Sequence, residues 1–245
     1  MTLRAVLGRG AMIGALLLLA ACVTRSISDS GYRGQGNPMY RGELSEYDVV
    51  GVDRTAGFSE ADIQAAMVRK QPITVRKGSA VLLVQSGALL ADPDMISAME
   101  KYYTVSSFSG VPLDTTRYTG APQSPPVSYS QLFRMAAAKG GYETVIVYWG
   151  VLESASQGLG GKAISWVPVI GGIVPDETQH MRIRLMMAVI DTRTGQWESF
   201  SPEPLEDEAT SNQHGRAASD QEQVALLKGK AYKAAAEAVA LRYAR

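Results

Sequence analysis

Few residues of this chain combine the types and the spacing that catalysis requires. Its 245 residues include two histidines, His180 and His214, and neither stands at a metalloprotease spacing from an acidic residue. The sequence contains neither the Gly-x-Ser-x-Gly elbow of hydrolases nor the Gly-x-x-x-x-Gly-Lys loop that binds phosphate. Each histidine is interpreted as a surface residue, and we expect a non-enzymatic protein with no catalytic residue, no metal and no cofactor.

Two short segments invite a ligand-binding interpretation. Residues 158–162, Gly-Leu-Gly-Gly-Lys, follow a strand pattern, but the residues after them form no helix whose N-terminus could hold an anion. We interpret them as a hairpin loop. The acidic run at 206–208, Glu-Asp-Glu, could attract a cation, and a solvated loop is the favoured interpretation.

The single cysteine, Cys22, follows a segment typical of a secretory signal peptide. Arg4 and Arg9 precede about eleven uncharged residues, whereas a membrane span needs roughly twenty apolar residues. The segment ends in Leu19-Ala20-Ala21-Cys22, which resembles the bacterial lipobox of leucine, two small residues and an acylated cysteine. We therefore expect residues 1–21 to be cleaved off between Ala21 and Cys22. The alternative is an ordinary secretory signal followed by an incidental free thiol.

Acylation of Cys22 would place the protein on a membrane. Two or three acyl chains such as palmitate on one cysteine satisfy the two-signal requirement for stable anchoring. Position 23 is Val rather than Asp, which by analogy with lipoprotein sorting in diderm bacteria favours the outer membrane, on its periplasmic face. Commitment of the thiol to lipid leaves none for thiol catalysis, and one cysteine forms no intrachain disulfide.

The charge balance excludes one class of partner. The whole chain has 24 basic and 24 acidic residues, and the signal peptide removes Arg4 and Arg9, so the mature chain carries a net charge of about −2. Nucleic-acid binding needs a basic surface, so we expect no nucleic-acid partner.

The mature chain divides into two parts. Residues 22–45 are rich in Ser, Gly, Arg and Asn and predict a lipidated flexible tether. Residues 46–245 predict one α/β domain with a mixed sheet, parallel βαβ crossovers, an antiparallel hairpin and a C-terminal helix. The expected strands cover residues 47–52, 80–84, 105–108, 144–152, 181–190 and 196–200, and the expected helices begin near residues 59, 93, 130 and 219.

The C-terminal helix has a regular apolar pattern after a capping box at Ser219–Glu222. Its spacing of threes and fours predicts one buried face, made of Val224, Leu227, Ala231, Ala234, Ala238 and Leu241.

Residues 164–175 form the most apolar segment of the mature chain. A hairpin that turns at Gly171-Gly172 and packs on the domain is favoured over an exposed patch. If it is exposed, the segment would mark a contact with a partner or a membrane. We name it the candidate partner surface, with the residues Trp166, Val169, Ile170, Ile173 and Val174.

Residues 182–196 carry a family resemblance. The alternating run Arg182-Ile-Arg-Leu, followed by Val189-Ile-Asp-Thr-Arg-Thr-Gly-Gln196, is similar to the strand–turn–strand of a group of envelope α/β lipoproteins. That group includes curli-secretion-channel lipoproteins, penicillin-binding-protein activator lipoproteins and the amino-terminal domain of the Tol–Pal translocation protein. The resemblance implies a non-enzymatic periplasmic module that works by binding or assembling.

The functional expectation is an outer-membrane-anchored binding or assembly factor of the cell envelope. Its partners would be the membrane, through acylated Cys22, and an envelope protein, which could be a second copy of the chain. One alternative is a subunit of an oligomeric export assembly. A membrane-spanning hairpin would need roughly ten alternating residues per strand, and Pro168 and Pro175 interrupt the one candidate. The other alternative is a cell-wall or peptide hydrolase with an unrecognised site.

Overall fold

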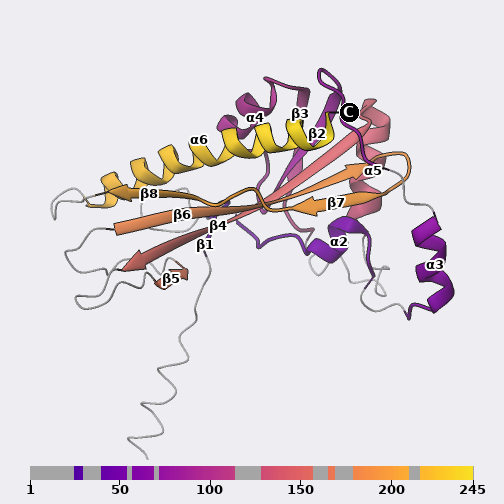
Figure 1. The fold of residues 1–245 in the computed structure, drawn as a ribbon, viewed down its shortest axis with the longest axis horizontal. Helices are drawn as coiled ribbons and strands as arrows, with labels where there is room; N and C mark the ends of the chain where they lie inside the picture. Colours follow the sequence, from indigo (N-terminus) through magenta and orange to yellow (C-terminus); the bar gives the residue numbers. More distant parts are fainter. Residues whose placement is uncertain are drawn as a thin grey trace, which may run out of the picture.

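A computed structural model describes residues 25–29, 40–53, 57–68, 72–113, 128–156, 165–168, 179–209 and 216–244. Within them, eight strands form one sheet in the order β3-β2-β4-β6-β7, with β1 and β5 on β4 and β8 on β6 (Figure 1). The strands are β1 Arg25–Ser26, β2 Ala80–Ser86, β3 Thr104–Gly110, β4 Thr144–Ser156, β5 Ser165–Pro168, β6 Gln179–Asp191, β7 Trp197–Phe200 and β8 Leu205–Ala209. The helices are α2 Glu46–Val50, α3 Glu60–Val68, α4 Pro93–Met99, α5 Tyr129–Gly140 and α6 Arg216–Tyr243.

The sheet is mixed, as the sequence predicts. β2 pairs in parallel with β3 and with β4, and α4 and α5 make the crossovers between these strands. β6 pairs antiparallel with β4 along nearly its whole length, from Thr144↔Asp191 to Ala155↔His180. The turn after β6 leads into β7, where the Asp191 carboxylate accepts the Thr194 N–H and Gly195 has a φ of 74°. These findings confirm the α/β class and the predicted hairpin.

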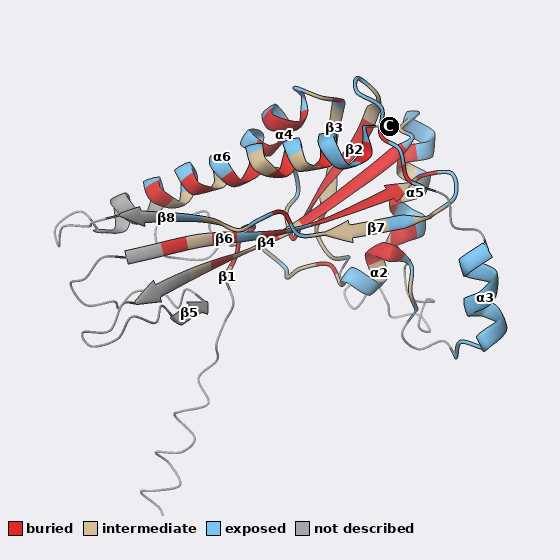
Figure 2. Ribbon diagram, viewed as in Figure 1, coloured by how far each residue is buried: buried red, intermediate tan, exposed pale blue. Residues whose placement is uncertain are grey.

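Helices cover both faces of the sheet and give three layers. Val81 and Leu83 of β2 point to one face, where they join the core under α4 and α6. Leu82 and Val84 point to the other face, where they join the core under α2 and α5. A strand buried on both faces explains the continuous apolar run at residues 80–84, and the buried colour of β2 and β4 marks this centre (Figure 2).

The strand predicted at residues 47–52 is wrong, because the structure has helix α2 there. Ser45 takes the extended N-cap conformation, and Glu46 and Asp48 lie in the first turn, where acidic groups favour the helix dipole. Gly51 ends the helix with a φ of 80°. The apolar pattern suggests that Val49 and Val50 are buried in a strand. They are buried, but in this five-residue helix.

The C-terminal helix differs from its prediction at both ends. α6 begins at Arg216, so the capping box at 219–222 lies inside the helix. Leu241 is 77% exposed, and Val224, Ala234 and Ala238 are only half-buried. The predicted stripe repeats every 3.5 residues, whereas the buried one repeats every four, and the two diverge along the helix. The buried apolar residues are Leu227, Ala231, Tyr232, Ala235, Ala236, Val239 and Tyr243, and the polar Gln223 is buried as well.

The acidic run at 206–208 is a strand rather than the expected solvated loop. It lies in β8, where Glu206 is opposite Arg182 of β6 and their side-chain atoms Oε1 and Nη1 are 3.8 Å apart. Charged residues on an edge strand disfavour pairing with the strands of other chains. This effect explains the acidic run without a bound cation.

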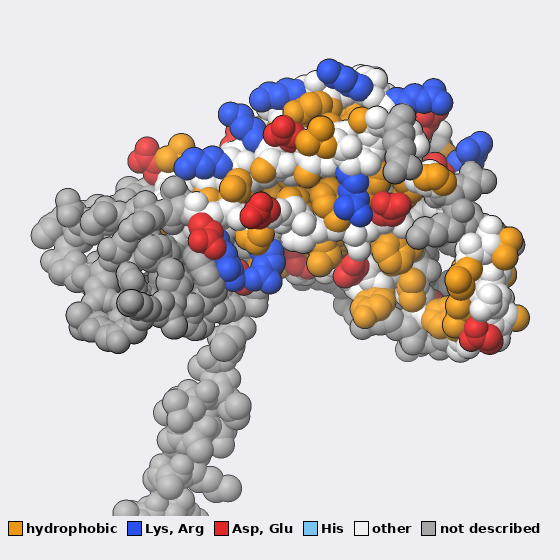
Figure 3. Space-filling model, viewed as in Figure 1, with side chains coloured by type: hydrophobic (Ala, Val, Ile, Leu, Met, Phe, Trp, Pro, Cys, Tyr) orange, Lys and Arg blue, Asp and Glu red, His pale blue; other side chains and the backbone are white. Residues whose placement is uncertain are grey.

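Helix α3 begins near residue 59 as expected and has a capping box, but it buries no residue. The Asp62 carboxylate accepts the Ser59 N–H at 2.9 Å, and the Ser59 hydroxyl accepts the Asp62 N–H at 3.2 Å. Ile63, Met67 and Val68 are exposed, and apolar side chains are visible on this helix at the right of the space-filling view (Figure 3).

Candidate functional site

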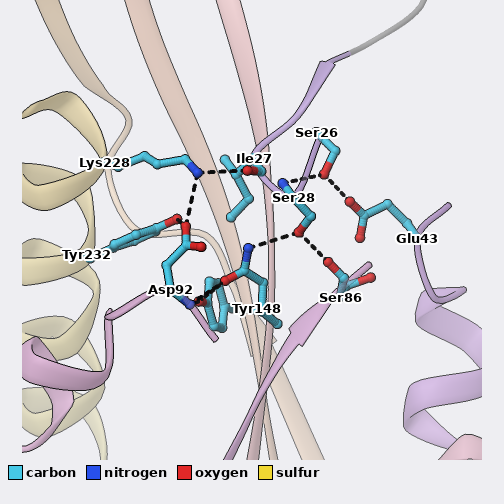
Figure 4. A network of polar contacts seen from close by, with 10 residues as sticks. Ser26, Ile27, Ser28, Glu43, Ser86, Asp92, Tyr148, Lys228 and Tyr232 are labelled. Carbon is cyan, nitrogen blue, oxygen red and sulfur yellow. Dashed lines mark hydrogen bonds and ion pairs between the residues drawn. The ribbon is translucent and has the colours of Figure 1, made fainter. Parts of the chain in front are cut away.

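A polar network lies at the carboxyl end of β2, between the sheet and α6 (Figure 4). Gln85 and Ser86 end β2 and are each 1% exposed. In open α/β sheets, ligands usually bind at the carboxyl ends of parallel strands. Buried polar residues at this position are therefore candidates for a functional site. Buried polar side chains need partners, and the partners define what this arrangement does.

Asp92 is the centre of the network on the α6 side. It occupies the N-cap position of α4, but its side chain makes no capping hydrogen bond. The carboxylate oxygen Oδ2 instead accepts the Tyr232 hydroxyl at 2.6 Å and lies 3.0 Å from the Lys228 ammonium. Asp92 therefore links the start of α4 to α6 through an ion pair and a charge-assisted hydrogen bond.

Two tyrosines pack inside the network and act as neutral donors. The Tyr148 hydroxyl donates to the Gln85 side-chain oxygen, and that oxygen also accepts the Asp92 N–H at 2.8 Å. The Tyr148 and Tyr232 rings meet edge to face with centroids 5.9 Å apart. Burial raises the pKa of both phenols well above 10, and the Asp92 carboxylate raises it further. Neither phenol ionises at neutral pH.

The chain's own N-terminal segment, residues 25–29, packs at this end of β2. Lys228 donates to the main-chain oxygen of Ile27 at 2.8 Å, and Ile27 N–H donates to Gly150 O of β4 at 2.9 Å. The Gln85 side-chain amide donates to the Ser28 hydroxyl at 3.0 Å, which in turn donates to Ser86 O at 2.6 Å. The Ile27 side chain is 1% exposed. Groups from α6, β2 and β4 thus hold this segment.

Residues 40–45 form a second strap beside the first. Ser26 donates its hydroxyl to a Glu43 carboxylate oxygen, and the Ser86 hydroxyl accepts the Leu44 N–H at 2.8 Å. Trp149 donates its indole N–H to Leu44 O at 3.1 Å. The other carboxylate oxygen of Glu43 is buried without a hydrogen-bond partner, and burial raises the pKa of this carboxyl.

The network fastens the N-terminal segment to the domain body. Its hydrogen bonds join these side chains to one another and to main-chain groups of residues 27, 44, 86 and 92, and one oxygen of Glu43 is buried without a partner. We name the set formed by Ser28, Gln85, Asp92, Tyr148, Lys228 and Tyr232 the clamp. Residues 25–29 and 40–45 belong to the segment that the sequence assigns to a tether, and the structure packs them on the domain.

Sequence reasoning misses the clamp because its members are far apart in the chain. Ile27 and Lys228 are separated by 201 positions, and no spacing rule connects them. Asp92 directly precedes Pro93, the first residue of α4, but its side chain bonds Lys228 and Tyr232 of α6 instead of capping α4. A signal exists on α6, where Lys228 and Tyr232 are four residues apart on the buried side of the helix. Another is Gln85-Ser86, a polar pair that ends a continuous apolar strand.

The structure describes only part of the predicted functional residues. Ala21 and Cys22 lie outside the described residues, as do His214, residues 158–162 and Val169, Ile170, Ile173 and Val174 of the candidate partner surface. Trp166 lies in β5, where its backbone is opposite Ala155 of β4. His180 lies at the start of β6, opposite the same Ala155 and Glu208. Neither residue belongs to the clamp.

The described part of the chain contains no candidate metal site. Its His, Cys, Asp and Glu side chains form no group of three or more that could hold a metal ion. Its helices include none with the length and apolar character needed to cross a membrane.

Comparisons with known proteins give one family match. A family model described as YafT bacterial lipoprotein matches residues 45–242. The crystal structure of lipoprotein GNA1162 from Neisseria meningitidis is 12% identical with a TM-score of 0.27, and the match covers 62% of this chain and 99% of that one. A neuraminyllactose-binding hemagglutinin homolog from Helicobacter pylori is 12% identical with a TM-score of 0.28, covering 71% and 90%. No curated protein gives a significant sequence match.

Proposed function

The chain belongs to the YafT bacterial lipoprotein family, and from this premise we propose an outer-membrane-anchored periplasmic lipoprotein that acts as a non-enzymatic binding or assembly factor. The observation that carries the proposal is the sequence Leu19-Ala20-Ala21-Cys22, which precedes the domain matched by the family model. Cleavage between Ala21 and Cys22 and acylation of the Cys22 thiol attach the domain to the bilayer. Val23 directs it to the outer membrane.

The clamp supports a binding role rather than a catalytic one. Catalytic groups need free donors, acceptors or nucleophiles directed at a substrate. In the clamp, Asp92, Lys228 and Tyr232 bind one another, and Gln85 and Ser28 hold main-chain groups. Residues 25–29 and 40–45 of the chain itself pack at the end of β2. The resemblance of residues 182–196 to envelope lipoproteins that bind or assemble points the same way.

The anchor is tested by metabolic labelling with a palmitate analogue in a diderm bacterium. The native chain is expected to incorporate the label and to sediment with outer membranes. Its mature N-terminus should be a modified Cys22, as read by mass spectrometry of the N-terminal peptide. Cys22→Ala is the matched control and should remain unlabelled. Label on the Cys22→Ala chain, or none on the native chain, would contradict the anchor.

The binding role is tested by crosslinking the tagged, full-length lipoprotein in intact cells. We expect one envelope protein, or a second copy of this chain, to be crosslinked at native expression level. The matched control is the Cys22→Ala chain, which has no thiol to acylate and should lose a partner whose binding depends on the lipid anchor. Release of soluble fragments from purified peptidoglycan or peptides by the purified lipoprotein would contradict a non-enzymatic role.

A further inference from the structure

The distance from the anchor to the sheet is set by two residues. Val23 and Thr24 alone separate Cys22 from Arg25, the first residue of β1. Successive Cα atoms are 3.8 Å apart, so the Cα atom of Cys22 lies within about 11 Å of the Cα atom of Arg25. β1 itself is fixed, because Arg25 and Ser26 pair with Leu152 and Val151 of β4 and Ile27 is buried under Lys228.

The register shows where the chain leaves the sheet. β6 pairs with one edge of β4 from Thr144 to Ala155, so β1 and β5 must share the opposite edge (Figure 1). On that edge Arg25 is opposite Leu152, and Pro168 is opposite the next residue, Glu153. Pro168 thus occupies the position that Thr24 would take if β1 continued. β5 therefore occupies the edge of β4 directly beyond Arg25, and we name the place where β1 meets β5 the β1–β5 junction.

The two ends of the sheet are far apart relative to this short connection. Leu152 lies eight residues after Thr144 in β4. Because a strand rises about 3.3 Å per residue, the two residues are about 26 Å apart along the strand. Thr144 is opposite Asp191, which begins the turn that carries Arg193. With the anchor within about 11 Å of Arg25, the end of the sheet at the junction is close to the lipid and the Arg193 turn is remote.

We infer that the domain sits directly against the bilayer, with the β1–β5 junction facing the lipid surface. The inference rests on the acylation of Cys22 that is part of the proposed function. The clamp holds residues 25–29 in the fold, so the domain has no long tether on which to move away from the membrane. Trp166 of the candidate partner surface lies in β5, whose last residue, Pro168, is at this junction. A protein that binds there meets the domain at the membrane surface.

The test measures energy transfer from a single label on the domain to acceptor lipids. The lipoprotein is reconstituted in vesicles of phosphatidylethanolamine and phosphatidylglycerol that carry a headgroup acceptor. Because Cys22 is blocked by lipid, Arg184→Cys and Arg193→Cys each provide one reactive thiol, and both arginines are exposed. Arg184 is opposite Val151, at the level of the junction, and Arg193 is in the remote turn. We expect higher transfer from position 184 than from position 193.

A length variant separates the short connection from other causes. A Gly/Ser linker of about 20 residues, with an r.m.s. span of about 25 Å, is inserted between Thr24 and Arg25. The difference between the two labelled positions should then be lost, whereas the same linker added after Arg245 should preserve it. Equal transfer from both positions with the native length, or an unchanged difference after the insertion, would overturn the inference.

Vesicle flotation distinguishes the two levels of failure. Lipoprotein that floats with the vesicles but gives equal transfer at both positions overturns only the orientation. Chain that does not float overturns the acylated anchor, and with it both proposals. Thermal unfolding of each variant shows whether the fold and the clamp are kept.

Discussion

Lys228 of the C-terminal helix donates a hydrogen bond of 2.8 Å to the main-chain oxygen of Ile27, five residues after the predicted acylation site. The same ammonium lies 3.0 Å from the Asp92 carboxylate. One side chain therefore connects residues 25–29, the start of α4 and the last helix.

Replacing Lys228 should loosen the N-terminal segment as well as destabilise the fold. Lys228→Met keeps the aliphatic stem but leaves Ile27 O without its donor and Asp92 without its counter-ion. We expect a loss of about 1–3 kcal/mol in the free energy of unfolding, measured by urea denaturation. Cleavage by protease within residues 25–29 should become faster. Lys233→Met on the exposed side of the same helix is the control, and an equal effect of both substitutions would argue against the clamp.

The absence of a side chain at Gly150 of β4 allows the Ile27 side chain to pack against the strand. A Cβ atom at this position would lie 2.7 Å from both Ile27 Cγ2 and Leu185 Cδ2. Gly150→Ala should therefore destabilise the domain by about 1–3 kcal/mol through overpacking, measured by thermal or urea unfolding. Gly57→Ala is the matched control, because nothing lies within 4 Å of its added Cβ atom. A neutral Gly150→Ala would show that Ile27 is not held where the structure places it.

The buried carboxyl of Glu43 should make stability depend on pH. Burial raises its pKa above the ordinary 4.5, so the folded state binds a proton more readily than the unfolded state. Stability should therefore rise as the pH falls through the folded-state pKa of Glu43, and this gain should be complete below 4.5.

Glu43→Gln separates this carboxyl from the other acidic groups. The variant should be more stable than the native chain at neutral pH and should lose that part of the pH dependence. The urea midpoint measured across the acidic range is the readout, with exposed Glu46→Gln as the control. If the urea midpoint of the Glu43→Gln chain depends on pH as that of the native chain does, the pH dependence does not come from Glu43.

Position 23 should determine the membrane in which the lipoprotein resides. Val23→Asp is expected to retain the protein in the inner membrane, because Asp after the acylated cysteine is the retention signal in the sorting analogy. Sucrose-gradient fractions of the two membranes provide the measurement, and Val23→Ala should keep the native distribution. Outer-membrane residence of Val23→Asp would remove the sequence argument for sorting.

The candidate partner surface is tested by charge and by truncation. Ile173→Asp and Trp166→Ala should each reduce crosslinking to the envelope partner and leave the unfolding transition unchanged. Met67→Asp, on the exposed side of α3, introduces the same charge elsewhere and should have no effect on crosslinking. If all three variants crosslink as the native chain does, the partner binds another part of the domain.

Local patterns predict the scaffold well because most elements here follow local rules. The sequence patterns place five features where the structure has them: β2, β4, α4, α5 and the turn at Asp191–Gly195. The failures have physical causes. The segment 46–50 is too short for periodicity to distinguish a strand from a helix. In α6, Tyr232 and Tyr243 are buried, and the buried residues follow a period of four rather than 3.5. The clamp depends on tertiary contacts between residues that no local pattern joins.

The clamp also orders events in time. Residue 27 leaves the biosynthetic machinery long before residue 228, so the pocket for Ile27 is incomplete until the last helix has been made. Closure of the contact across 201 positions is therefore a step of high contact order that requires the last helix. If Cys22 is acylated as proposed, residues 25–29 dock on the domain only after the last helix is available.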